Sequence, residues 1–390
     1  MGSLYIEYRS RRGSSLVFPA VQHTNYQYLE LKHTEGFVGG IPANVCEFAE
    51  KLVKIDLTQN GVVNIENISC LINLDTLILT ENQITNVRNT TFSGLALLRV
   101  LDLSKNMIKE VEPMALSGAF TFIHFANFHE NVMETVDITN IIIENPFCSI
   151  DYRDNQINAL TNTISFEVDI QKVYGNGGYV DFGNNDFQTW INFTDLGFSD
   201  LTLIGKVMNF GFDIRGANWT CDCTMQPFLE LVKPYLPKIW RDYFNITCSH
   251  PPKLSGLSIA ELVKSNRLDY FICKISTTHG CPQKCNCYEQ PSEKRTVVNC
   301  TGAGLNAMPA KLPAYNNIEL FVEDNNIEEL GENDYLNRIQ RLEIHGNPLR
   351  KIALGVPKKI KHNVALSLNC NELESIPSTF KHLDQSKIRL

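Results

Sequence analysis

A pattern of five apolar positions around one asparagine recurs along this chain, and it constrains the fold more than any other feature. The pattern is L-x-x-L-x-L-x-x-N-x-L-x-x-L, where L stands for any large apolar residue. Its steps of 3, 2, 3, 2 and 3 match neither an amphipathic helix nor a strand throughout. The chain is therefore expected to form a stack of similar coils. The asparagines of the copies are Asn60, Asn82, Asn106, Asn131, Asn155 and Asn185 in one array, and Asn325, Asn347 and Asn371 in another.

This pattern resembles the leucine-rich repeat, which implies an α/β solenoid. Each copy would supply one short strand, x-L-x-L-x, whose two apolar side chains point inward. The asparagine amide would bond the backbone of its own turn and of the adjacent copy, so that the asparagines form a ladder. A buried amide without partners would cost about 1–3 kcal/mol, which explains why this position is so regular.

Strand residues between the inward apolar side chains should face outward on a concave sheet. These residues are the candidates for contact with a binding partner, with plain solvation as the alternative for each. They are Asp56, Thr58, Ile78, Thr80, Asp102 and Ser104 in the first array, and Phe321, Glu323, Glu343 and His345 in the second.

Eight of the 12 cysteines lie between Cys221 and Cys300, and close cysteine spacing is typical of an oxidising compartment. Cys221, Cys223, Cys248 and Cys273 form one cluster, and Cys281, Cys285, Cys287 and Cys300 form the next. Four thiolates in the second cluster could bind zinc. The C-x3-C-x-C spacing differs from the usual paired C-x2-C form, however, and both neighbouring arrays need their open ends covered. We therefore interpret the clusters as a carboxyl-terminal cap and an amino-terminal cap, with a helix over residues 226–236 in the first.

These features divide the chain into five segments. They are a poorly matched segment at 1–25, a first array at 26–217, a carboxyl-terminal cysteine cap at 218–275, an amino-terminal cysteine cap at 279–313, and a second, truncated array at 314–390.

The remaining cysteines leave two interpretations open. Cys46 and Cys70 each follow an inward isoleucine by five residues, a slot that Phe92 fills in the next repeat. Such slots stack side by side, so these sulfurs either form a disulfide or fill the slot as buried thiols. Cys148 and Cys370 have no evident partner and are expected to be free.

The order of repeats and caps resembles the ectodomain of invertebrate Toll receptors of the multiple-cysteine-cluster kind. The strongest match is Cys281-Pro282 with Cys285-Asn286-Cys287-Tyr288, then Cys300 and Leu305 to Pro309. The resemblance implies the disulfides Cys221–Cys248, Cys223–Cys273, Cys281–Cys287 and Cys285–Cys300. It also implies an extracellular, non-enzymatic receptor in innate immunity or development. Such a receptor binds a protein ligand, often a cystine-knot cytokine, and dimerises to signal across the plasma membrane. The alternative family is a secreted or matrix-associated Slit-like adhesion or guidance protein.

The chain also carries Asn-x-Ser/Thr sequons, the glycosylation acceptor sites of secreted proteins. They begin at Asn67, Asn89, Asn192, Asn218, Asn245 and Asn299. About five would arise by chance in a chain this rich in asparagine, so they permit an extracellular location without establishing it.

Several function classes are disfavoured by the sequence. A net charge of −8 is unsuited to nucleic-acid binding. Hydrolase, zinc-protease and phosphate-loop motifs are missing, so we expect no enzymatic activity, no cofactor and no metal. The sequence also lacks a signal-peptide core and an apolar run of membrane-spanning length. We therefore expect a fragment or an incomplete gene model, attached to a membrane only through segments missing from this chain.

Overall fold

The computed structural model describes residues 2–5, 26–30, 39–41, 43–116, 123–142, 148–165, 167, 178–198, 210–232, 246–369, 371–373, 380–381 and 383–389. The chain divides into two compact units. The first unit comprises Met1–Cys221 and Phe228–Glu261, and the second comprises Asp222–Pro227 and Leu262–Leu390. The predicted segment 218–275 is thus shared between the two units.

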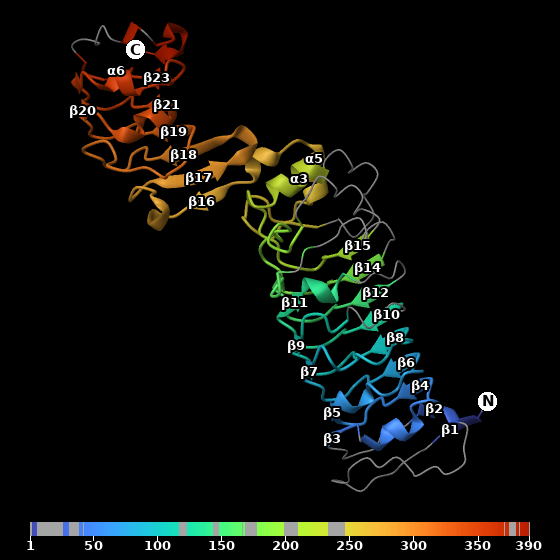
Figure 1. Cartoon of the computed structure of the whole chain (residues 1–390). Coiled ribbons are helices and arrows are strands. Elements are labelled where there is room, and N and C mark those ends of the chain that lie inside the picture. The colour runs from blue at the N-terminus through green and yellow to red at the C-terminus, as the bar shows by residue number, and fades with distance from the viewer. Residues whose placement is uncertain are drawn as a thin grey trace. The chain divides into compact units, whose positions relative to one another are not determined.

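One parallel sheet dominates the described part of the first unit, with strands that stack in chain order (Figure 1). Its nine strands are β1 (Gly2–Tyr5), β2 (Tyr26–Glu30), β4 (Lys54–Asp56), β6 (Thr76–Ile78), β8 (Val100–Asp102), β10 (Phe125–Asn127), β12 (Ser149–Asp151), β14 (Gly178–Asp181) and β15 (Phe210–Asp213). Strand β1 lies in the segment 1–25 that the repeat pattern does not match. The other side of the coils carries three short strand pairs and 3₁₀ turns. These are β3 (Gly39–Gly40) with β5 (Val62–Asn64), β7 (Asn86–Val87) with β9 (Glu110–Val111), β11 (Thr135–Asp137) with β13 (Ala159–Thr161), and the turns η1 (Ala43–Phe48), η2 (Glu66–Ile68) and η3 (Ile138–Asn140).

A seven-stranded sheet organises the described part of the second unit. Its strands are β16 (Cys273–Ile275), β17 (Asn286–Gln290), β18 (Arg295–Asn299), β19 (Ile318–Phe321), β21 (Ile339–Glu343), β23 (Ala365–Ser367) and β24 (Ile388–Arg389). Strand β17 is antiparallel to both neighbours, whereas the strands from β18 onward are parallel. The pair β20 (Glu329–Leu330) with β22 (Lys351–Ile352) lies opposite the sheet.

Short helices complete the described part of the chain. They are α3 (Gln226–Val232), α5 (Ile259–Lys264), α6 (Val356–Lys359), and the turns η6 (Leu268–Tyr270), η7 (Thr277–His279), η8 (Pro291–Glu293), η9 (Asp334–Arg338) and η11 (Gln385–Lys387). Helix α3 begins the helix expected over 226–236, and positions 233–236 lie outside the described residues. Of the helices in the described ranges, none has the length and apolar character needed to cross a lipid bilayer.

The inward apolar side chains form the cores. Ile55 and Leu57 are fully buried, as are Leu320 and Val322 in the second unit. Towards the end of the first array, aromatic side chains take over one inward slot. The rings of Phe128 and Tyr152 stack with centroids 5.1 Å apart, and Tyr152 stacks on Phe182 at 5.2 Å. Stacked aromatic rings therefore fill the core position that leucine occupies in the preceding repeats.

The repeat asparagines form the hydrogen-bonded ladder that the pattern predicts. The Nδ2 of Asn106 donates to the carbonyls of Leu103, in its own coil, and Leu79, in the preceding coil, both at 2.9–3.0 Å. Its Oδ1 accepts from the amide of Ile84. Equivalent bonds link neighbouring coils through Asn82, Asn131, Asn155, Asn185, Asn325, Asn347 and Asn371.

A left-handed residue precedes most of these asparagines. The φ angle is +58° at Glu81, +54° at Lys105 and +52° at Asp324. This conformation is costly for residues other than glycine. The asparagine bonds beside it hold the backbone in place, so ladder and turn stabilise each other.

Candidate binding surface

The outward side chains at the ends of the first-unit strands form one continuous row. Strand pairing places Asp56 beside Ile78, Ile78 beside Asp102, and Asp102 beside Asn127. The same register continues through Asp151, Asp181 and Asp213. We call Asp56, Ile78, Asp102, Asn127, Asp151, Asp181 and Asp213 the strand-end row. Only its first three members were among the predicted contact residues, although the remaining acids occupy the same repeat slot.

Most acids of this row stabilise the turn that follows their own strand. Oδ1 of Asp56 accepts from the Thr58 hydroxyl at 2.7 Å and from the Thr58 amide at 3.2 Å. Oδ1 of Asp102 accepts from the hydroxyl and amide of Ser104 at 2.6 and 2.9 Å. A carboxylate that bonds the amide two residues ahead closes a local turn. The row is therefore structural as well as outward-facing.

The expectation that all ten candidate contact residues face solvent is wrong for three of them. Asp56, Ser104 and Glu343 are only 8%, 5% and 8% exposed. Their hydrogen bonds and the neighbouring strands cover them. The other seven candidates, Thr58, Ile78, Thr80, Asp102, Phe321, Glu323 and His345, are half-buried.

Charge pairs occupy the carboxyl-terminal part of the row. The guanidinium of Arg215 donates to both carboxylate oxygens of Asp213, and Arg153 pairs with Asp151 in the same way. The hydroxyl of Tyr179 lies 3.2 Å from both Asp181 and Asp213. This part of the face thus presents alternating positive and negative groups.

Burial and hydrogen bonding shift the pKa values of Asp213 and Asp181 in opposite directions. Burial opposes ionisation of Asp213, but the hydrogen bonds from Arg215 outweigh it and lower its pKa below 3.8. Burial, with the nearby charge of Asp213 adding to it, raises the pKa of Asp181 above 3.8. The Tyr179 hydroxyl lies between these two carboxylates, and burial raises its pKa too.

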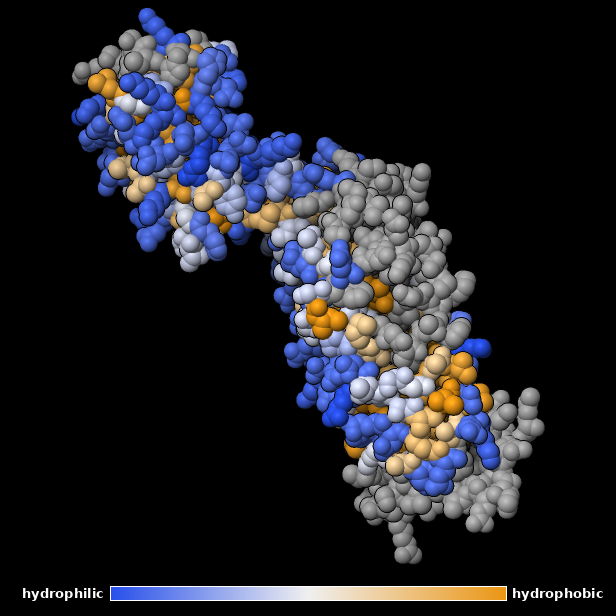
Figure 2. Space-filling model, viewed as in Figure 1, coloured by the Kyte–Doolittle hydropathy of each residue, from blue (hydrophilic) through white to orange (hydrophobic). Residues whose placement is uncertain are grey.

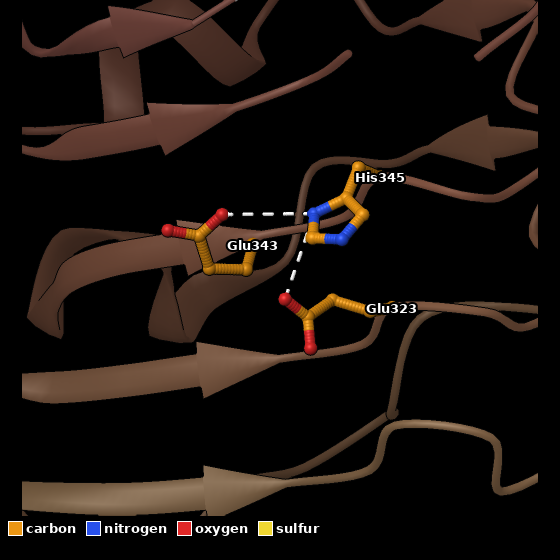
Figure 3. Close-up of side chains that lie close together, drawn as sticks. All are labelled: Glu323, Glu343 and His345. Carbon is orange, nitrogen blue, oxygen red and sulfur yellow. Dashed lines mark ion pairs between the residues drawn. The ribbon is translucent and has the colours of Figure 1, made fainter. Parts of the chain in front are cut away.

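The second unit places three of the predicted contact residues together (Figure 3). His345 Nδ1 lies 3.5 Å from Glu323 Oε1 and 3.8 Å from Glu343 Oε2. Phe321 is on the adjoining strand and contacts the guanidinium of Arg341 at 5.5 Å from its ring centroid. Parallel pairing of β19 with β21 brings these residues side by side, which the sequence alone does not show.

The cysteines of both clusters are joined in the structure in the pairing that the resemblance implies. Cys221–Cys248 belongs to the first unit, whereas Cys223–Cys273, Cys281–Cys287 and Cys285–Cys300 belong to the second. The four sulfurs that could have held zinc are thus two disulfides. Strand β16, which carries Cys273, pairs with β17 of the second-unit sheet and so extends that sheet.

Cys46 and Cys70 are also joined, with Cα atoms 5.6 Å apart. Cys148 is a free and buried thiol, and burial raises its pKa to about 12. Its thiolate is therefore scarce near neutral pH, which makes it a poor nucleophile. Cys370 lies outside the described residues.

The sequon asparagines in the described ranges are on the surface. Asn67, Asn89, Asn192, Asn218 and Asn299 are exposed, and Asn245 lies outside those ranges. Asn67 and Asn192 use their Nδ2 groups in hydrogen bonds, to the Ile41 carbonyl and the Asp195 carboxylate. Glycan attachment at either position would replace one proton of that amide.

Comparisons with known proteins agree with the repeat fold. The "Leucine rich repeat" family model matches residues 72–119. "Leucine-rich repeat-containing protein 3" from Danio rerio is 27% identical over 109 residues, which span 27% of this chain and 40% of that protein.

Two structures of the Toll–Spatzle complex, "a molecular hub in Drosophila development and innate immunity", each contain a chain of similar fold. One aligns over 93% of this chain and 54% of its own length, at 17% identity and a TM-score of 0.51. The glycosylated form aligns over 90% and 52%, at 19% identity and a TM-score of 0.55. This chain therefore has the leucine-rich-repeat solenoid fold, and it spans about half the length of the matched chain in each of these two structures.

Proposed function

We propose that this chain is the ligand-recognition region of an extracellular leucine-rich-repeat receptor of the Toll type. It binds a protein ligand such as a cystine-knot cytokine through the outward face of the nine-stranded sheet. The observation that carries this proposal is the strand-end row, which aligns seven side chains along one face of one sheet. Four of them, Ile78, Asp102, Asn127 and Asp181, are half-buried and so partly accessible, whereas Asp56, Asp151 and Asp213 are buried. A face of this length suits a macromolecule better than a small ligand.

The chemistry of the row supports a protein partner. Ile78 is a half-buried apolar side chain between Asp56 and Asp102. In the view of Figure 2, apolar residues gather near β6 and β8 on the first unit. Protein interfaces commonly combine an apolar centre with charged groups around it. The Arg153 and Arg215 pairs would supply such charged groups at the other end of the row.

The disulfides support an extracellular location, because they persist in oxidising compartments. We propose that Cys221–Cys248 and Cys223–Cys273 close a first repeat array, and that Cys281–Cys287 and Cys285–Cys300 open a second. A chain of similar fold takes part in the Toll–Spatzle complex. By analogy, ligand binding here would promote receptor dimerisation, and a longer receptor that includes this region would attach to the membrane and signal.

The experiment measures binding of the oxidised chain to Spatzle and to a panel of cystine-knot cytokines by surface plasmon resonance. Ile78→Arg places a large charge within the strand-end row and should weaken binding at least tenfold. Ile72→Arg is the matched control, because Ile72 is 53% exposed and lies in a loop outside the row. It should bind like the natural chain.

Thr80→Arg tests the same face at a second position and guards against a folding defect in Ile78→Arg. Thermal melting of each variant identifies such a defect. Absence of binding to every cytokine in the panel, or equal binding by all variants, would contradict the proposal.

A further inference from the structure

Glu323, Glu343 and His345 form a cluster in the second unit with the geometry of a metal site. One ligand atom from each side chain lies within 4.8 Å of the other two. Glu343 ends β21, and His345 follows it by two residues. Glu323 follows β19 by two residues, and the amide of Asp324 donates to the His345 carbonyl at 3.2 Å. Neighbouring coils of the solenoid thus hold all three side chains on rigid backbone.

Each carboxylate uses one oxygen to bind a neighbouring side chain and points the other at the histidine. Oε2 of Glu323 accepts from the Thr301 hydroxyl at 2.9 Å, which leaves Oε1 facing His345. Oε1 of Glu343 accepts from Nε of Arg341 at 2.8 Å, which leaves Oε2 facing His345. Such supporting bonds hold metal ligands in position before the metal binds.

The third atom, Nδ1 of His345, is buried and makes no hydrogen bond to any described residue. A proton on Nδ1 would best bond one carboxylate at about 2.7–2.9 Å, yet the two oxygens lie at 3.5 and 3.8 Å. Ligand atoms about 2.0–2.1 Å from a tetrahedral zinc ion are about 3.4 Å from each other. Both nitrogen–oxygen distances are closer to this spacing than to the length of a direct hydrogen bond, and the two carboxylate oxygens lie within 4.8 Å of each other. The two nitrogen–oxygen distances therefore fit a shared cation better than a single direct hydrogen bond.

We propose that Glu323, Glu343 and His345 bind a divalent transition-metal ion, with Zn²⁺ as the favoured ion. One imidazole and two carboxylate oxygens suit zinc, and a water molecule would complete the tetrahedron. Calcium is disfavoured because it requires six or more oxygen ligands. This site departs from the expectation of no metal that the sequence alone suggests, and it is independent of the proposed receptor function.

A second histidine between two carboxylates provides a matched control in the first unit. His129 Nε2 lies 2.8 Å from Glu130, and its Nδ1 lies 3.2 Å from Asp154. The two acids face opposite nitrogens of the ring, so one ion cannot bind both acids and one nitrogen. His129 therefore has a similar composition without convergent geometry.

The test is isothermal titration of the oxidised, full-length chain with Zn²⁺. We expect one site that His345→Ala removes and that Glu323→Gln weakens at least tenfold. Thr301→Val keeps all three ligands but removes a supporting bond, and should weaken binding about tenfold. His129→Ala should leave affinity and stoichiometry unchanged.

Cobalt(II) absorption gives a second readout. Nitrogen and oxygen ligands should produce weak visible bands without the intense near-ultraviolet band of a thiolate, and His345→Ala should abolish them. Three outcomes would overturn the proposal: no zinc binding by the natural chain, equal binding by the natural chain and His345→Ala, or a thiolate band that persists in His345→Ala.

Discussion

The strand-end position of the repeat carries aspartate repeatedly in the first unit, whereas the aligned positions in the second unit are Asn299, Phe321, Glu343 and Ser367. The short aspartate side chain turns back onto the amide two residues ahead, as Asp102 does at 2.9 Å. Glu343 is one methylene longer and instead pairs with Arg341, with its second oxygen facing His345. The shorter aspartate side chain thus closes its own turn, whereas the glutamate side chain, longer by one carbon atom, can contribute to a site shared with other residues.

Replacing a ladder asparagine should reveal the largest difference in stability between the two units. Asn106 is 7% exposed and bonds four buried backbone groups, whereas the equivalent Asn325 is half-buried. Water can replace part of the Asn325 bonds but little of those of Asn106. We expect Asn106→Ala to destabilise the first unit by about 3 kcal/mol and Asn325→Ala to destabilise the second by about 1 kcal/mol.

Urea denaturation followed by hydrogen exchange of peptides from each unit measures the two costs separately. Exchange in the unmutated unit serves as the internal control. Equal costs for the two substitutions would show that burial does not govern the strength of the ladder.

Adding a methyl group where neighbouring coils pack closely should give a smaller difference in stability between the two units. A Cβ at Gly94 would overlap the backbone carbonyl oxygen of Ser69, whereas the atoms nearest to a Cβ at Gly355 belong to the side-chain carboxylate of Glu332. A carboxylate can rotate away, but a backbone carbonyl inside a coil cannot. Gly94→Ala should therefore cost about 2 kcal/mol by overpacking, and Gly355→Ala less than about 1 kcal/mol. Urea midpoints of the two variants check this order, and a larger shift for Gly355→Ala would contradict it.

The repeat pattern was sufficient to predict the ladder, because Asn82, Asn106 and the others each sit among five apolar positions that agree. It also indicated which strand positions lie on the face opposite the core, and seven of the ten candidates there are partly exposed. It could not predict that Asp56 and Ser104 are buried, because that depends on a hydrogen bond that closes over the strand end. The strand β1 was missed because its segment carries no repeat signal.

The cluster in the second unit shows a different limit. Glu323, Glu343 and His345 were each identified as outward, yet nothing in the spacing of 20 residues between Glu323 and Glu343 indicates convergence. Their meeting depends on the register of β19 and β21, which is set by the length of the intervening coil. The acids Asp151, Asp181 and Asp213 could have been found from the slot they share with Asp56, even though longer insertions separate their repeats.

The smallest expected effect is on the pH dependence of stability. It compares an ion pair with a buried aspartate and an ion pair with an exposed one. Asp213 is 1% exposed and pairs with Arg215, whereas the side chain of Asp334 is fully exposed and pairs with Lys359. The folded-state pKa of Asp213 is lowered, so its stabilising contribution is complete above its unfolded value of 3.8 and is lost as pH falls through the lower folded value. Asp181 acts with the opposite sign, since its raised pKa makes ionisation unfavourable for folding.

Asp213→Asn should therefore destabilise the first unit by about 1–2 kcal/mol near neutral pH, a value reduced by the solvent around Arg215. The difference from the natural chain should shrink as pH falls below 3.8, because the carboxylate becomes protonated first in the unfolded chain and, at lower pH, in the folded chain as well. Asp334→Asn should change stability little at any pH, because its pair is screened by water. Urea denaturation between pH 7 and pH 3 measures both effects. A cost for Asp213→Asn that stays constant over this range would mean that shape, and not charge, makes this aspartate important at the end of the strand-end row.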